Sequence, residues 1–283
     1  MDIIQQQWSS VSTLYIHQIN FIFLTLCIVV IFCIMILVWE IQTKEGRLSK
    51  NDPHSFAQTE NIRTTHIHLE LEVDFREYKG YNETFDLKGH VILSMVNLNL
   101  NSSTVRIDVN KDLLINGVYE EDTKELLDFQ YVNNYIVEMG DNDNKEWIES
   151  RKSKIGHYLN INLPKIKKEQ FRLHIDYKID YQSCYMWSYC GGIYHYYGMV
   201  YTQNQPIDAR TWIPCQDTPA AKVTYTAAIT APKGYKVLMS ASEEKQISTE
   251  DNKTITMFSQ NKPVPTYVIV LAVGKLERKF QRL

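Results

Sequence analysis

Two glutamines separated by a single residue, Gln203 and Gln205, form the most prominent candidate binding pair in this chain of 283 residues. They follow the aromatic run YHYYGMVYT, and residues two apart in a strand point to the same side. We therefore expect both amides to face one space, with Pro206 ending the strand because proline cannot donate to a ladder. Amides can hold a ligand but supply neither nucleophile nor proton shuttle. On pattern alone, a polar loop between two strands explains the same residues.

A second group of polar residues follows directly. Arg210 precedes the turn-forming segment PCQDTP, residues 214–219, and an Asp-Thr pair between two prolines is favourable turn chemistry. We expect Asp217 to hold this turn and Cys215 to be a structural thiol. From Val223 the sequence alternates between apolar and polar residues again, which predicts another strand.

The order of these residues resembles the zinc aminopeptidases of the aminopeptidase N family, especially the leukotriene A(4) hydrolase and aminopeptidase B branch. The matching residues are T-Q-x-Q-x-I-x-x-R from Thr202, P-C-Q-D-T-P-x-x-K-x-T-Y from Pro214 and L-M-S-A from Leu238. Weaker similarity extends from about His66 to the end of the chain. The resemblance implies the N-terminal all-β domain of that family, with the catalytic domain expected to begin just after residue 283.

The resemblance also implies a role for the two glutamines. Gln203 and Gln205 match the pair that lines the substrate cleft from the N-terminal domain, and Gln205 matches the one nearest the scissile end. The alternative is that both amides bond to neighbouring backbone. Pro206 and Asp208 depart from the residues usual at these positions, and Pro206 removes a backbone donor beside the cleft.

The residues for hydrolysis are missing from the sequence. A zinc aminopeptidase needs H-E-x-x-H, which places two histidines and a general base on one helix, and the family adds G-x-M-E-N. None of the eight histidines lies in such a motif. His66 and His68 fall on the polar face of a predicted strand and are interpreted as solvated rather than metal-binding. We expect no catalytic residue and no cofactor in this chain; zinc and a peptide substrate are expected only where a catalytic domain is supplied.

Most of the chain alternates with period two, as strands do. The first clear case is HIHLELEVDF, residues 66–75, and the clearest is Phe171–Tyr181. Further strands are predicted over these segments: Gly89–Leu98, Ser103–Asn110, Leu113–Val118, Tyr135–Met139, His157–Leu163, Val237–Ala241, Thr254–Ser259 and Tyr267–Val273. Many short strands without a long amphipathic helix predict an all-β domain over residues 64–283, an antiparallel sandwich or saddle-shaped pair of sheets.

The N-terminal region predicts a membrane anchor. Residues 1–20 form a polar tail, and Phe21–Trp39 follows with no charge, proline or glycine. At 1.5 Å per residue this segment crosses most of a hydrocarbon core of about 30 Å. A cleaved signal peptide fits poorly, because no basic region precedes the segment and no small-residue cleavage site follows it. Residues 40–63 are polar and are expected to form a flexible linker.

The side of the membrane stays open at this stage. Lys44, Arg47 and Lys50 follow the span, and the positive-inside rule then places the β-domain in the cytoplasm, whereas membrane-anchored relatives hold it outside the cell. Cys184 and Cys190 could close a disulfide if the compartment is oxidising. The net charge of −3 gives no reason to expect a nucleic-acid partner.

Two functions fit these observations. The first is the non-catalytic N-terminal domain of a membrane-anchored zinc aminopeptidase, of which this chain is a fragment or truncated form, inactive alone. The second is a stand-alone, membrane-tethered pseudoenzyme domain that binds a partner protein.

Overall fold

The computed structural model describes residues 52, 54–78, 82–132, 156–163, 168–179, 192–196 and 198–277. All of them lie in one compact unit, residues 48–283. The expected tail, the expected span Phe21–Trp39, the predicted strand Tyr135–Met139 and the Cys184–Cys190 pair lie outside the described residues. Within the described part, no helix is long and apolar enough to cross a membrane.

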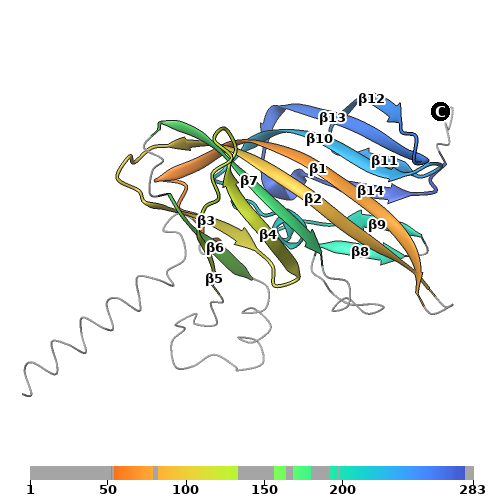
Figure 1. The fold of residues 1–283 in the computed structure, drawn as a ribbon, viewed down its shortest axis with the longest axis horizontal. Coiled ribbons are helices and arrows are strands. Elements are labelled where there is room, and N and C mark those ends of the chain that lie inside the picture. The colour runs from red at the N-terminus through yellow and green to blue at the C-terminus, as the bar shows by residue number, and fades with distance from the viewer. Residues whose placement is uncertain are drawn as a thin grey trace, which may run out of the picture. The chain divides into compact units, whose positions relative to one another are not determined.

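The largest element is a sheet of seven strands, seen across the upper part of Figure 1. Its neighbouring strands pair antiparallel except β1 and β10, which are parallel, with His66 opposite Thr224. From one edge to the other the strands are β12 (Ser242–Ser248), β13 (Lys253–Val264), β10 (Val223–Pro232), β1 (Ile62–Tyr78), β2 (Asn82–Asn97), β7 (Gln170–Ile179) and β4 (Leu113–Glu120).

Two smaller antiparallel sheets complete the domain. One has the order β11 (Lys236–Met239), β14 (Leu271–Gly274), β9 (Met199–Thr202) and β8 (Ile193–Tyr196). The other has the order β3 (Thr104–Val109), β6 (His157–Asn162) and β5 (Phe129–Val132). In the described connections lie the short 3-10 helices η2 (Ala209–Thr211) and η3 (Thr266–Val268). The described part of the fold is all-β as predicted, but its strands form three sheets rather than two, and β1 pairs with β10 in parallel.

All three sheets contribute to one hydrophobic core. Leu69 of the large sheet, Val273 of the four-stranded sheet and Ile107 of the three-stranded sheet are all fully buried members of it. The alternation along each strand explains this arrangement, since β10 is buried at every second residue. The large sheet therefore presents its apolar face to the core and its polar face outward.

The folded domain begins earlier than the linker prediction placed it. Ser55, Phe56 and Ala57 are buried, and the Phe56 ring packs on Tyr158 with centroids 4.8 Å apart. This contact could not be predicted from the polar composition of the segment. The buried Ser55 hydroxyl donates a hydrogen bond to Asp108, and no apolar alternation marks the segment as part of the core. The expected linker over residues 40–63 thus includes, from Ser55 on, residues packed on the domain.

The aromatic run before the glutamines is a hairpin rather than one strand. β8 and β9 pair antiparallel, and Gly198 turns between them with φ of 69°. β9 ends at Thr202, so Gln203 and Gln205 lie in the loop after it, and Pro206 is not the residue that ends the strand. The sequence also did not predict β5 and β12, whose exposed residues lack a clear apolar alternation.

Candidate functional site

The loop after β9 exposes both glutamines while burying the residue between them. Gln203 and Gln205 are exposed, whereas Asn204 is only 2% exposed. The Asn204 side-chain amide donates to the carbonyl of Ile269, and its oxygen accepts the indole N–H of Trp212 at 3.0 Å. A buried anchor thus fixes the backbone from which the two glutamines project.

The same loop is held by main-chain hydrogen bonds at both ends. The amide of Gln203 donates to Gly192 O at 2.7 Å, and the amide of Asp208 donates to Asn204 O at 2.8 Å. Neither glutamine side chain forms a hydrogen bond to any described residue. Both side chains are exposed, and within the described part of the chain neither bonds to the neighbouring backbone. A depression of about 360 Å³ follows in the same loop, lined by Pro206 and Thr218 among others, and neither glutamine lines it.

Arg210 does not face this open surface, because it is 1% exposed in a buried ionic cluster. Its Nε donates to Asp217 Oδ2 at 3.0 Å, and its Nη1 lies 3.7 Å from Asp108 Oδ1. Its Nη2 donates to the carbonyls of His54 and Asp217 at 2.8 and 2.9 Å. This fork of donors crosslinks the start of the domain, β3 and the 214–219 turn.

The two carboxylates are as fully engaged as the guanidinium. Asp108 accepts from the Ser55 hydroxyl at 2.6 Å and from the amides of Phe56 and Asp217 at 2.8 and 3.0 Å. Asp217 also accepts from the Thr266 hydroxyl at 2.7 Å. Burial raises the pKa of Asp108, and the charge of Arg210 opposes that shift. Asp217 holds its turn as expected, and it does so as part of this cluster.

The other residues of the 214–219 segment are structural too. Gln216 accepts from the Thr64 amide at 2.8 Å and donates to Ile62 O at 2.8 Å, which ties the turn to the start of β1. Cys215 is a buried free thiol whose pKa is raised well above its usual value, first by burial and then by the nearby carboxylates. A protonated, buried thiol is chemically inert.

The outer face of the large sheet carries a row of histidines. His66 and His68 lie on it as predicted, half-buried rather than fully solvated, with ring nitrogens 2.7 Å from the hydroxyls of Thr224 and Thr226 respectively. These bonds to β10 give both rings partners from the protein, so the two do not form a metal-ligand pair with each other.

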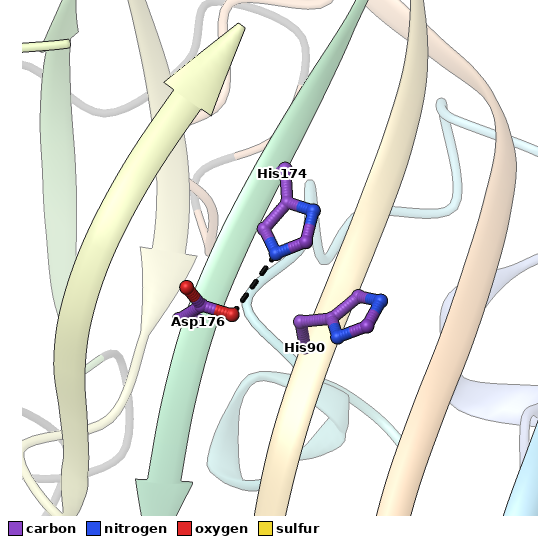
Figure 2. A group of neighbouring side chains, drawn as sticks. All are labelled: His90, His174 and Asp176. Atoms are coloured by element: carbon purple, nitrogen blue, oxygen red, sulfur yellow. Dashed lines mark hydrogen bonds and ion pairs between the residues drawn. The ribbon is translucent and has the colours of Figure 1, made fainter. Parts of the chain in front are cut away.

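A different group on this face does bring metal-ligating side chains together. His90 of β2 and His174 and Asp176 of β7 each offer one ligand atom, and these atoms all lie within 4.8 Å of one another. Figure 2 shows the two imidazoles side by side with the Asp176 carboxylate beside them. Burial, followed by the neighbouring His174, lowers the pKa of His90, while Glu70 and Asp176 oppose the shift.

Sequence reasoning missed this group because its members are far apart along the chain. The H-x-D spacing of His174 and Asp176 in a strand was a usable signal, since it places both on one face. The third member required the pairing of His90 with Asp176 across β2 and β7, which no local pattern reveals. The group lacks the H-E-x-x-H arrangement, so it does not fit the zinc site expected of a catalytic domain.

Comparison with known proteins identifies the family. The profile of the peptidase M1 N-terminal domain matches residues 63–268, which is most of the chain. The chain belongs to this family. The matched region contains the Gln203–Gln205 loop, the Arg210 cluster and the outer-face histidines.

Relatives of this M1 N-terminal domain match along the same region. Leukotriene A-4 hydrolase of Xenopus laevis is 28% identical over 234 residues, which cover 80% of this chain and 34% of the relative. Aminopeptidase B of Rattus norvegicus is 44% identical over 77 residues, 27% of this chain and 11% of the relative. The chain thus spans about a third, or less, of the curated relatives it matches.

Solved structures of two M1 enzymes share the fold. Leukotriene A4 hydrolase from Saccharomyces cerevisiae superposes with a TM-score of 0.57 at 21% identity, covering 84% of this chain and 33% of that one. The M1 zinc metallopeptidase from Deinococcus radiodurans gives a TM-score of 0.56 at 19% identity, covering 77% and 43%. At these identities the likeness concerns the fold, and it agrees with the all-β N-terminal domain predicted from the sequence.

Proposed function

We propose that this chain serves as the N-terminal domain of a membrane-anchored zinc aminopeptidase and lines one side of its peptide cleft with Gln203 and Gln205. The observation that carries the proposal is the loop geometry. Two exposed amides that have no hydrogen-bond partner among the described residues flank the buried Asn204, so they project from a fixed backbone. A backbone that is already fixed removes the loop-ordering part of the entropic cost of binding.

The chemistry of the two side chains suits an extended peptide. Each glutamine offers an amide N–H₂ donor and a carbonyl acceptor, the complement of the C=O and N–H groups along a peptide backbone. The zinc ion and the general base belong to the catalytic domain, because no H-E-x-x-H motif occurs in this chain. The role proposed for the domain is therefore to bind and orient the peptide, and the chain alone does not hydrolyse it.

The buried cluster supports this role indirectly. Arg210 and Asp217 lie within twelve residues of Gln205, and they connect the loop to β3 and to the residues before β1. A rigid scaffold beneath a binding loop keeps its side chains in place when a ligand arrives. The cluster acts on the glutamines only through the position of the loop.

Membrane anchoring is the second part of the proposal, and it rests on the sequence of Phe21–Trp39. Nineteen uncharged residues, all but Thr25 apolar, satisfy the length requirement for a membrane-spanning helix. The full chain in membranes should resist extraction at alkaline pH, and a version lacking residues 1–40 should be extracted. Protease protection in sealed vesicles then determines which side of the membrane the β-domain occupies.

Complementation tests the catalytic part. The full chain should not release an amino acid from an aminoacyl-p-nitroanilide or a tripeptide. Residues 54–277, which include the buried residues before β1 and strand β14, should support aminopeptidase activity when they replace the corresponding region of Xenopus laevis leukotriene A-4 hydrolase. The control is the same hydrolase with its N-terminal domain deleted. A folded, zinc-loaded chimera no more active than that control would contradict the cleft role and would favour the pseudoenzyme that binds a partner protein.

A further inference from the structure

The outer-face group of His90, His174 and Asp176 has the composition of a transition-metal site. Two imidazole nitrogens and one carboxylate oxygen are ligands that Zn²⁺ and its neighbours in the first transition row prefer, whereas Mg²⁺ and Ca²⁺ favour oxygen alone. All three side chains stand on paired strands, with His90 directly opposite Asp176. Ligands on strands of a sheet are held more precisely than ligands on loops.

The hydrogen bonds of His174 point to a cation. Its Nδ1 lies 2.9 Å from Glu121 Oε2 and its Nε2 lies 2.9 Å from Asp176 Oδ1. A neutral imidazole carries one N–H and can donate to only one of these carboxylates. The unprotonated nitrogen then points its lone pair at a carboxylate oxygen, and the two repel each other unless a proton or a metal ion lies between them. His174 is thus arranged to share a cation with Asp176.

The carboxylates around the two rings have little other cationic charge beside them. Glu70 and Asp176 have only histidines as ionic partners among the described residues, while Glu121 is also paired with Lys124 at 2.7 Å. His90 stacks on His174 with ring centroids 4.3 Å apart, which keeps the two imidazoles side by side. One divalent ion bound to both rings and to Asp176 would offset the charge of these carboxylates.

Other charges facing the group do not fill the site. Lys88 is paired with Glu72 at 3.1 Å, and Lys178 lines the same open depression of the sheet. His68 is bonded to Thr226 and lies 3.1 Å from Glu70. His90 itself forms no hydrogen bond to any described residue. Its ring is therefore available as a ligand.

His174 has an outer carboxylate within hydrogen-bond distance, of the kind that orients metal ligands, and His90 has one farther away. Glu121 faces Nδ1 of His174, and Glu70 Oε2 lies 3.7 Å from Nε2 of His90. Carboxylates in this position fix the ring and raise its basicity. Tetrahedral Zn²⁺ separates its ligand atoms by about 3.3 Å. Side-chain rotations on the open face of the sheet can bring the three ligand atoms from their present separations of up to 4.8 Å to this distance.

We propose that His90, His174 and Asp176 form a divalent transition-metal site, best suited to Zn²⁺, on the outer face of the seven-stranded sheet. Three protein ligands leave a position for water or for a ligand from a partner. All three ligands belong to the matched N-terminal domain, and none of them lies in an H-E-x-x-H motif.

Zinc binding to the full chain tests the proposal directly. The tag-free, 283-residue protein is titrated with ZnCl₂ against a chromophoric chelator, and Co²⁺ is then substituted to record its visible d–d spectrum. We expect the His90→Ala/His174→Ala double variant to bind one equivalent fewer than the wild type. Glu121→Gln should lower the zinc affinity of this site by about 10- to 100-fold. The Co²⁺ bands of the site should vanish in the double variant.

His66→Ala is the matched control, because His66 lies on the same sheet face but outside the group, and it should bind zinc as the wild type does. If the double variant does not fold, Asp176→Asn tests the same site with a side chain of equal size, and it should lose at least 10-fold in affinity. Equal stoichiometry in the wild type and the double variant, or an equal loss in His66→Ala, would overturn the proposal.

Discussion

Replacing Arg210 with methionine tests the buried cluster beneath the glutamine loop. Methionine keeps the length and apolar stem of the side chain but removes every donor of the guanidinium. Two carboxylates, Asp108 and Asp217, then remain buried at 0% and 1% exposure without a cation. The carbonyls of His54 and Asp217 also lose the donor that Nη2 provides.

The expected loss of stability is large. Removing one partner of a buried ion pair costs about 3–5 kcal/mol, because the other charge is left uncompensated. For Arg210→Met we expect the free energy of unfolding to fall by about 4 kcal/mol, which is a substantial part of the 5–15 kcal/mol typical of native proteins. With a urea m-value of about 2.5 kcal/mol per molar, the unfolding midpoint moves down by about 1.6 M.

The assay is equilibrium unfolding in urea, followed by tryptophan fluorescence and circular dichroism on the wild type and the variant. Arg172→Met is the matched control, because Arg172 pairs with Asp122 on the surface, where the side chains are 49% and 44% exposed. Exposed pairs contribute about 0.2–1 kcal/mol. The double variant Arg210→Met/Asp217→Asn should lose less than the sum of the two single variants, because the pair is coupled.

The pH dependence gives an independent signature. Without Arg210, the folded-state pKa of Asp108 rises further above its unfolded value, so the folded variant binds more protons than the unfolded chain. Its stability then falls as pH rises through that window. The deficit relative to the wild type should be smaller at pH 5 than at pH 7.5. A loss below about 1 kcal/mol, or a deficit independent of pH, would refute the structural role of Arg210.

Three further predictions concern single positions. Gly89→Ala should destabilise the domain by more than about 2 kcal/mol, because an added Cβ would lie 2.0 Å from Glu70 O at a φ of 150°; urea unfolding measures it. Asn204→Ala should cost about 2–4 kcal/mol, since it leaves the indole N–H of Trp212 and a carbonyl unpaired in the interior. Burial, followed by the charge of His68, lowers the pKa of His66 in the folded state below 6.5. The unfolded chain therefore binds more protons, and the free energy of unfolding falls as the pH drops through 6.5. His66→Gln should flatten this pH dependence in a series of urea unfolding curves.

Controls for these positions come from the same chain. Gly234→Ala, where an added Cβ meets nothing within 4 Å, should cost less than Gly89→Ala, and equal losses would contradict the steric argument. Gln203→Ala and Gln205→Ala should leave stability within about 0.5 kcal/mol of the wild type, as exposed positions do. An unchanged pH slope in His66→Gln would mean that another group governs acid sensitivity.

Strand alternation made much of the fold predictable from the sequence. β1, β7 and β10 are half-buried strands whose apolar residues repeat at period two, so their existence and facing followed from local pattern. The same reasoning could not find β12, because an exposed edge strand such as SEEKQIS has no apolar face. It also could not find the parallel pairing of β1 with β10, which joins residues some 160 positions apart and depends on the core as a whole.

Some residues of the candidate site could be predicted from local sequence, and others could not. The exposed glutamine pair was visible because its spacing and neighbours resemble a known motif. The roles of Arg210 and Gln216 were not, because each is set by partners at residues 54–64 and 108 that folding brings together. The group of His90, His174 and Asp176 could not be predicted for the same reason. The strand register between β2 and β7, rather than a local sequence period, places His90 opposite Asp176.

We propose above that Gln203 and Gln205 hold the peptide substrate of an M1 aminopeptidase, and kinetics on a chimera test this role. In the chimera, residues 54–277 replace the corresponding region of Xenopus laevis leukotriene A-4 hydrolase, and kcat and KM are measured for a tripeptide. We expect Gln205→Ala to lower kcat/KM by about tenfold, as the loss of one good hydrogen bond of about 1.4 kcal/mol does. Zinc content and stability should be unchanged. Identical kinetic constants in a folded, zinc-loaded Gln203→Ala/Gln205→Ala variant would contradict it.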